Sequence, residues 1–338
     1  MGIYVTEGSS HYREQIQERL DRFKCESPSR VVEFRTAREA SAKRILDLWC
    51  PAMDLFDGII LEVHGIGAKF FKRHRARGIE EDDPIFKVLA ILHARACSVT
   101  SDVRALLVTG HGFGASAHSR TLQEIAVVSS LIREYDPDVA QRYIDHEVID
   151  AFKAASEYNE VTKTTTAPPL DINEFTALTK EKDDLIDKYG KSFASTYGWA
   201  AKLLGNSRPT YRDLQKAAGL DDVQSVYTRA SHLVHAAALG TSQYLHHEDT
   251  TTTLLSGPRS WGLAQPASET LYALTLITNR FISLAEREPY DNDSTTEDVA
   301  TFVLQALVQE ATDSFSAIEQ NLRTKELDTR KSAENALP

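Results

Sequence analysis

The sequence predicts an all-α protein built as a helical bundle, and three observations support this class. The 16 glycines and 11 prolines make up about 8% of the 338 residues, below the ~12% usual in proteins, which disfavours a turn-rich all-β chain. Apolar residues recur at steps of three and four along most of the chain, as in helices with one buried face. No segment shows the alternation of apolar and polar residues that is typical of strands.

The first long helix is predicted from Ile45 to Phe70, where apolar residues alternate between steps of four and three. This spacing is typical of a helix packed nearly antiparallel to its neighbours. Pro51 removes a backbone donor, so we expect a kink or a break between two helices there. A second helix is predicted over residues 85–106, after a turn at residues 80–84.

Further helices are predicted along the rest of the chain, separated by short polar or proline-containing segments. Residues 161–169 contain no periodic apolar signal and end in two prolines, which indicates a linker or surface crossover. Residues 249–265 form a connection that is long for a bundle, and Trp261 predicts that this loop is anchored. The predicted helices are 113–135, 138–159, 172–189, 195–204, 210–218, 221–247, 267–287 and 296–325.

The linker divides the chain into two helical parts. We expect an N-terminal part at residues 1–160, a crossover at 161–169, a C-terminal part at 170–325 and a frayed tail at 326–338. The two helical parts can also pack together as one composite domain.

Net charge and cysteine content limit the classes of partner. The formal charge of −11 disfavours broad coating of DNA. The three cysteines lie far apart in sequence, which predicts neither a disulfide framework nor a zinc site and favours a reducing compartment. No window approaches ~18 uninterrupted apolar residues, and the first ten residues lack the pattern of a signal peptide. We therefore expect a cytoplasmic protein without a membrane partner.

Two predicted helices are unusually poor in charge. Between residues 105 and 132 the only formal charges are Arg120 and Glu124, and between 223 and 247 the only one is Arg229. Helices exposed to solvent normally carry lysine and glutamate, so we expect both to lie in the middle of the bundle. Arg120 and Glu124 are four residues apart, and an isolated buried ion is costly, so we expect them to be buried and paired.

The 223–247 helix carries a polar stripe on the face opposite its apolar one. Such a stripe can line a half-buried groove, where histidine is suited to proton transfer near neutral pH. It can equally form an internal hydrogen-bond network that fixes one bundle geometry. The stripe consists of Gln224, Thr228, Ser231, His235, Ser242 and His246.

Two motifs resemble a family whose function is unknown. The run G-F-G-A-S-A-H-S-R-T-L-Q-E at 112–124 contains Arg120 and Glu124, and Y-T-R-A-S-H-L-V-H at 227–235 contains Tyr227, Ser231 and His235. Together they resemble the mostly bacterial helical family "domain of unknown function 5677", over about residues 85–250. The resemblance implies an all-helical fold and no established activity.

Arg229 and His235 also form R-x5-H, a local pattern that resembles the signature of HEPN ribonucleases. Those proteins are small helical nucleases of toxin and antiphage systems that often act as dimers. The resemblance implies that a neutral histidine accepts the 2′-hydroxyl proton while the arginine holds the scissile phosphate, without a metal.

Three functions remain open at the level of sequence, and whether the protein is an enzyme is one of the open points. The leading hypothesis is a metal-independent endoribonuclease or nucleotide-handling effector of a bacterial defence or toxin system. The partners would be RNA or a nucleotide, a second copy of the chain or a defence-system protein, and no cofactor is required. The alternative is a non-catalytic helical sensor or adaptor whose polar cluster is structural. The candidate site residues are Arg120, Glu124, Arg229, Ser231 and His235.

A third hypothesis is a histidine-rich, metal-dependent hydrolase. The chain supplies nitrogen and oxygen ligands at His232, His235, His246, His247, Glu248 and Asp249. His111 and His118 could face them from the other charge-poor helix. Neither H-E-x-x-H nor E-x-x-H is present, so no established metal motif supports this hypothesis.

Overall fold

The computed structural model describes residues 10–80, 82–221, 227–229, 231–232, 238–248, 251–286 and 295–334. The prediction of an all-α protein is confirmed: helices make up nearly all of the ordered secondary structure in these ranges. The only sheet among the described residues is a two-stranded antiparallel hairpin.

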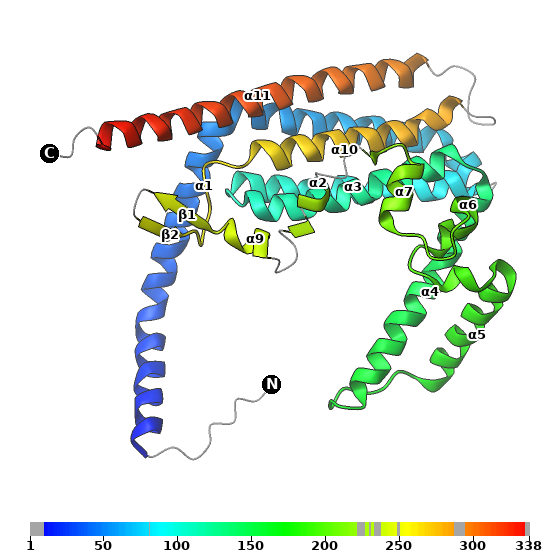
Figure 1. The fold of residues 1–338 in the computed structure, drawn as a ribbon, viewed down its shortest axis with the longest axis horizontal. Helices are drawn as coiled ribbons and strands as arrows, with labels where there is room; N and C mark the ends of the chain where they lie inside the picture. Colours follow the sequence, from blue (N-terminus) through cyan, green and yellow to red (C-terminus); the bar gives the residue numbers. More distant parts are fainter. Residues whose placement is uncertain are drawn as a thin grey trace.

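Five long helices form the bundle (Figure 1). α10 packs against each of the other four, which are α1, α2, α3 and α11. The five helices are α1 (Ser10–Arg75), α2 (Pro84–Val108), α3 (Gly112–Glu134), α10 (Ala264–Ile282) and α11 (Thr295–Glu334).

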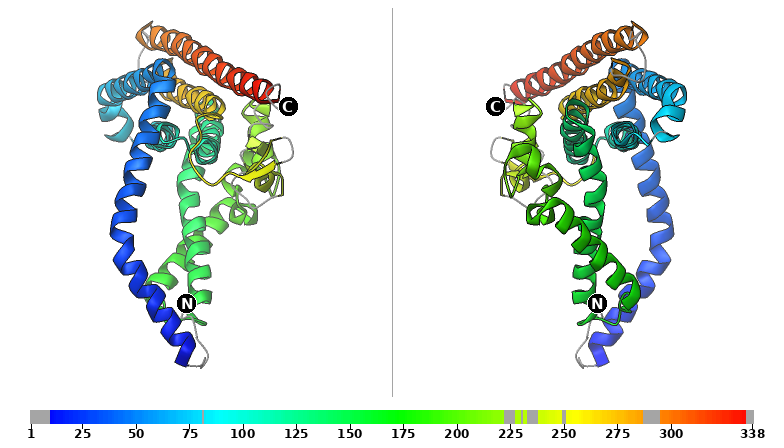
Figure 2. Two further views of the ribbon diagram at one scale, coloured as in Figure 1. Left: turned by 90° about the vertical axis from the view of Figure 1, so that its left-hand side faces the viewer. Right: turned by 90° about the vertical axis from the view of Figure 1, so that its right-hand side faces the viewer.

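α1 is one continuous helix, although Pro28 and Pro51 lie inside it. Figures 1 and 2 show that it changes direction between an N-terminal part that projects from the molecule and a C-terminal part that lies in the bundle. The projecting part is almost entirely exposed, and regular burial begins at Ile45. The expectation of a kink is met without a break between two helices.

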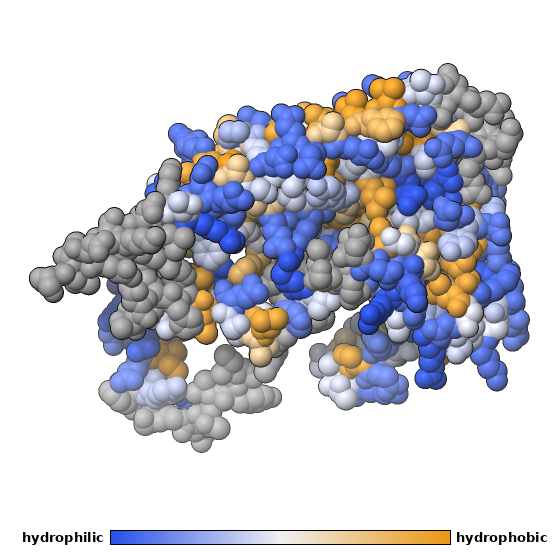
Figure 3. All heavy atoms as spheres, turned by 45° about the horizontal axis from the view of Figure 1, so that its top comes forward, coloured by the Kyte–Doolittle hydropathy of each residue, from blue (hydrophilic) through white to orange (hydrophobic). Residues whose placement is uncertain are grey.

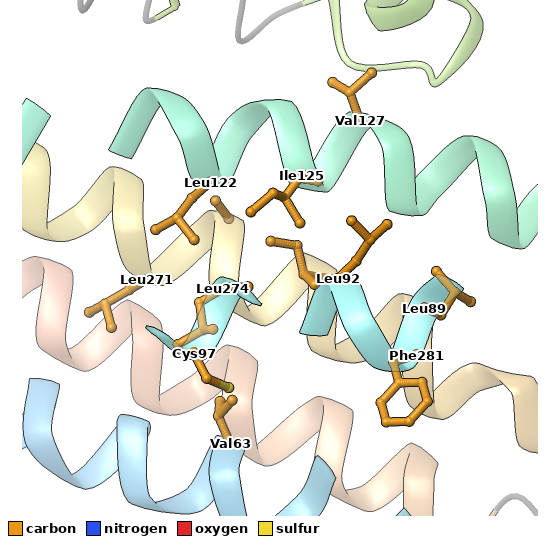
Figure 4. Close-up of a cluster of buried hydrophobic side chains, with 14 of the residues drawn as sticks. Val63, Leu89, Leu92, Cys97, Leu122, Ile125, Val127, Leu271, Leu274 and Phe281 are labelled. Carbon is orange, nitrogen blue, oxygen red and sulfur yellow. The ribbon is translucent and has the colours of Figure 1, made fainter. Parts of the chain in front are cut away.

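The hydrophobic core contains side chains from all five bundle helices. Figure 4 shows Leu92 of α2, Ile125 of α3 and Leu274 of α10 gathered in one cluster. α11 covers this core where it packs on α1. The ring of Phe315 of α11 packs on the rings of Trp49 and Phe56 of α1 at centroid distances of 5.7 and 6.2 Å. A single core thus joins helices from the first and last thirds of the chain.

Residues 137–189 form a helical hairpin that projects beside the bundle, as Figure 2 shows. α4 (Pro137–Thr162) and α5 (Ile172–Tyr189) pack on each other, and the predicted linker at 161–169 overlaps the last residues of α4 and most of the connection between the two helices. Asp171 caps α5 by accepting a hydrogen bond from the backbone N–H of Asn173 at 2.8 Å. An aspartate before the first helical turn satisfies donors that would otherwise lack partners.

Short elements connect α5 to α10. They include η2 (Lys191–Ala194), η3 (Gly198–Ala200), α6 (Ala201–Leu204), α7 (Tyr211–Ala217), α9 (Ala238–Ser242), β1 (Leu245–Glu248) and β2 (Thr251–Leu254). Two further short segments lie elsewhere, η1 (Ala76–Glu80) after α1 and η5 (Ser283–Glu286) after α10.

The predicted helix at 221–247 differs from the structure at its C-terminal end. α9 ends at Ser242, and residues 245–247 belong to strand β1. Residues 227–229, 231–232 and 238–242 are exposed or half-buried except for Gly240, so this described part is not central. α10 occupies the place beside α3 instead, and it too is poor in charge, with only Glu269 and Arg280.

The predicted loop at 249–265 is shorter in the structure, because Thr251–Leu254 form strand β2, and its part from Leu255 to Leu263 is anchored by hydrogen bonds to α1 and to Gly110. The indole N–H of Trp49 donates to the carbonyl of Ser260 at 3.0 Å, and the backbone N–H of Arg259 donates to the carbonyl of Gly110 at 2.9 Å. Gly110 has φ of +76°, and a Cβ there would lie 2.6 Å from the carbonyl oxygen of Arg259. Only glycine therefore allows this close approach.

The face of the molecule shown in Figure 3 is mostly hydrophilic. On the face shown in Figure 3, apolar side chains are scattered among charged ones. In the described part of the chain, no helix combines the length and apolarity needed to cross a membrane.

Replacing Phe315 by alanine tests the role of α11 in closing the core. Because Phe315 is fully buried against Trp49 and Phe56, F315A is expected to lower the free energy of unfolding by about 3 to 5 kcal/mol. F302A is the matched control, since Phe302 of the same helix is 70% exposed, and it should change stability by less than about 0.5 kcal/mol. Chemical denaturation measures both, and equal effects would contradict the packing of α11.

Candidate functional site

The predicted site residues fall into two polar clusters along α3. Arg120 and Glu124 lie in the first cluster, with Tyr227 from the segment that follows α7. Arg229 lies in the second, with Ser119 of α3 and Glu269 of α10. Arg120 and Arg229 therefore do not share a contact partner, although the sequence analysis assigned both to one site.

In the first cluster, the hydroxyl of Tyr227 joins Arg120 to Glu124. The guanidinium of Arg120 donates to this hydroxyl at 2.6 Å, and the hydroxyl donates to the Glu124 carboxylate at 3.0 Å. Arg120 and Glu124 also approach each other directly at 3.2 Å. The expected pairing is thus present, but the expected burial is incomplete, since the two side chains are 21% and 39% exposed.

Two further tyrosines extend the first cluster. The ring of Tyr211 packs on that of Tyr227 at a centroid distance of 4.3 Å, and Tyr197 interacts electrostatically with Glu124. Burial raises the pKa of all three phenols above its ordinary value, and the carboxylate of Glu124 raises it further. The phenols are therefore neutral at physiological pH, and Tyr227 can donate to Glu124.

In the second cluster, Arg229 forms an ion pair with Glu269, whose second carboxylate oxygen accepts from Ser119 at 3.3 Å. Glu269 is 10% exposed, whereas Arg229 is 38% exposed. Burial raises the pKa of Glu269, and the charge of Arg229 opposes this effect. The cluster is thus a largely buried carboxylate covered by a cation at the surface.

The remaining predicted site residues are only partly described. Ser231 is half-buried, and His235 lies outside the described residues, as do Gln224 and the other positions at 222–226 and 233–237. The arrangement of Arg229 with His235 is therefore not part of the described structure. What is described is that the guanidinium of Arg229 engages a carboxylate.

The metal-dependent hypothesis has no candidate centre in the described part of the chain. Within those residues, no three histidine, cysteine, aspartate or glutamate side chains lie close enough together to hold one metal ion. His111 contacts the guanidinium of Arg38 at 3.3 Å, and His118 is exposed.

A pocket of about 650 Å³ adjoins the first cluster, where Glu124 of α3 lines it. Its lining includes Tyr197, Tyr211 and His146. The Nε2 atom of His146 donates a hydrogen bond to the carbonyl of Ser195 at 3.0 Å, and its Nδ1 atom lies 3.5 Å from the carboxylate of Asp150. A smaller pocket of about 360 Å³ is lined by Arg229. Both clusters can therefore be reached from solvent.

Three site residues were missed by the sequence analysis as members of the site. Tyr227 and Tyr211 carry no formal charge, so a search for isolated charges passes over them although they hydrogen-bond or pack in the cluster. Glu269 could have been found, because it is one of only two charges in α10. Applying the charge-poverty argument to residues 264–282 would have identified it.

Together these features define an all-α bundle protein with two polar clusters along α3, in each of which an arginine pairs with a glutamate. Residues 86–252 match the model of a family of unknown function, DUF5677, so the resemblance predicted from the two motifs is confirmed for this region. No curated protein and no solved structure matches the chain. The match assigns no activity, and the HEPN-like pattern of Arg229 and His235 stays a prediction.

The raised pKa of Glu269 predicts a pH dependence of stability. A carboxyl group whose pKa is higher in the folded than in the unfolded chain binds more protons when folded, so it stabilises the fold as pH falls from the folded pKa toward the ordinary value of 4.5. Wild-type protein should therefore gain stability relative to E269Q as pH is lowered from 7 to 4.5. Urea denaturation of both proteins across this range measures the difference, and parallel pH profiles would contradict the prediction.

Removing the bridging hydroxyl tests the first cluster. Y227F deletes two hydrogen bonds to charged groups but leaves the ring, so the free energy of unfolding should fall by about 1.5 to 3 kcal/mol. Y272F is the matched control, since Tyr272 on α10 is 52% exposed, and it should be neutral within about 0.5 kcal/mol. If Y227F is also neutral, the hydroxyl does not join the ion pair in solution.

Proposed function

We propose that this protein is a non-catalytic helical sensor or adaptor, and that its two polar clusters fix the geometry of the bundle. The observation that carries this proposal is the pairing of both arginines. Arg120 engages Glu124 and Tyr227, and Arg229 engages Glu269. Both arginines of the predicted site thus have a carboxylate partner, as a structural role requires.

The same pairing disfavours cleavage of RNA at Arg229. A catalytic arginine stabilises the charge of the scissile phosphate through free N–H donors. Here a carboxylate already accepts from the guanidinium, and it would also repel the approaching phosphate. Catalysis at this position would require the ion pair to open and leave Glu269 largely buried without its partner.

The outline of the molecule also supports a sensor or adaptor. The N-terminal part of α1 and the α4–α5 hairpin both project from the bundle (Figure 2). The projecting part of α1 exposes large apolar side chains, including Phe23, Val32 and Phe34 at 67%, 60% and 60%. Exposed apolar side chains grouped on one element are typical of surfaces that contact other proteins.

The leading alternative is the metal-independent ribonuclease of a bacterial defence or toxin system, and one variant separates it from the proposal. R229A leaves the buried Glu269 unpaired, so we expect a loss of about 1 to 3 kcal/mol in unfolding free energy. R212A is the control, because Arg212 is exposed on α7, and it should be neutral.

Purified wild-type protein should leave RNA intact across pH 5 to 9, with or without EDTA. Cleavage of RNA that is abolished by R229A, with melting behaviour unchanged, would overturn the proposal and establish the nuclease instead. Cleavage that EDTA stops and zinc or manganese restores would support the metal-dependent hydrolase.

A further inference from the structure

A cationic pocket lies where α1, the N-terminus of α3 and the loop from Leu255 to Leu263 meet, next to the pocket that Arg229 lines. It encloses about 610 Å³, in the size range of small-molecule sites. We name it the Arg38–Arg259 pocket; its functional lining consists of Arg38, His111, Phe113, Tyr244, Arg259 and Trp261.

The pocket is positively charged although the protein is acidic. Arg38 and Arg259 line it, and among the lining residues that the structure describes there is no aspartate or glutamate. The whole chain has a formal charge of −11, so two arginines without a carboxylate in their pocket are an exception to its general character. Within the described ranges neither arginine has a carboxylate partner, unlike Arg120 and Arg229, so both can bind an anion from solution.

Arg259 is held in a way that leaves its donors available. Its guanidinium carbon lies 4.2, 5.4 and 5.2 Å from the ring centroids of Phe113, Tyr244 and Trp261. Stacking uses the faces of a guanidinium, whereas its N–H groups point outward in the plane. The aromatic rings therefore position the group without using its hydrogen-bond donors.

Arg38 and His111 add further donors. An arginine cannot accept a hydrogen bond, so the Nε2 atom of His111, 3.3 Å from the Arg38 guanidinium, must be the acceptor. The proton of the neutral imidazole then lies on Nδ1. Burial and the charge of Arg38 both lower the pKa of His111, which favours this neutral form.

The first turn of α3 also favours the binding of an anion in this pocket. Gly112, Phe113 and Gly114 line the pocket, and no side chain caps this helix end. The backbone N–H groups of a first helical turn lack intrahelical acceptors and carry partial positive charge. They support an anion that the arginines hold.

We propose that the Arg38–Arg259 pocket binds a free nucleotide, with Arg38 and Arg259 holding the phosphate and the ring of Tyr244 stacking on the base. Tyr244 is 44% exposed, so part of its ring is accessible to a planar ligand. Phosphate and base together match a lining of guanidinium groups and aromatic rings. This inference rests on the proposed function, because the nucleotide would be the ligand that the sensor detects.

The pocket combines two parts of the chain. His111, Phe113 and Tyr244 lie inside the region that matches the family model, whereas Arg38, Arg259 and Trp261 lie outside it. Two of the phosphate-binding groups thus come from segments outside the family region. The Trp49 and Gly110 hydrogen bonds that anchor the loop also hold Arg259 at the pocket.

Isothermal titration calorimetry with AMP tests the site on the full chain. Wild-type protein should bind AMP, and R38Q should weaken binding about tenfold or more because it removes a charged donor to the phosphate. R35Q is the matched control, since Arg35 is exposed on the same helix and does not line the pocket, and its affinity should equal that of the wild type. Both substitutions lie on the exposed part of α1, and circular dichroism verifies the fold.

Several outcomes of these titrations would overturn the inference. These are no AMP binding to wild-type protein, equal effects of R38Q and R35Q, or inorganic phosphate or adenosine alone binding as tightly as AMP. Tighter binding of a hexa-adenylate RNA than of AMP would also overturn it, because the occupant would then be RNA. Cleavage of RNA that depends on Arg229 would instead overturn only the proposed sensor function. Recovery of intact AMP after incubation would support its role as a ligand rather than a substrate.

Discussion

The fold depends on burying helices that carry too few charges to face water. α3 has only Arg120, Glu124 and, in its last turn, Arg133 and Glu134, and α10 has only Glu269 and Arg280. α10 must therefore be covered on several sides, and α1, α2, α3 and α11 provide that cover. Because α10 and α11 come from the end of the chain, this constraint joins the first and last thirds in one core.

One buried carboxylate connects that core to the surface loop. Glu319 of α11 accepts hydrogen bonds from the backbone N–H groups of Gly262 and Leu263 at 2.8 and 3.2 Å, directly before α10 begins. A carboxylate at a helix N-terminus satisfies donors and complements the helix dipole. The same contact fixes the end of the loop that carries Arg259. Core packing thus determines the shape of a pocket more than fifty residues away in sequence.

The arginines of this protein are used in two different ways. Arg120 and Arg229 have carboxylate partners, as expected for charges on or beside central helices. The described neighbours of Arg38 and Arg259 are an imidazole and aromatic rings, which carry no compensating negative charge. The first pair suits a structural role, and the second suits an anion from solution. This difference in partners separates the scaffold from the proposed ligand site.

The sequence by itself determined the class of fold, the course of most helices and the pairing of Arg120 with Glu124, because periodicity and i,i+4 spacing are local properties. It could not determine which segment lies beside α3. Both 223–247 and 264–282 are poor in charge, and only packing shows that α10 takes this place. Tyr227, Glu269 and the Arg38–Arg259 pocket were likewise decided by tertiary structure. Tyr227 and Glu124 are 103 residues apart, Arg229 and Glu269 are 40 apart, and Arg38 and His111 are 73 apart, and no local pattern encodes contacts over such separations.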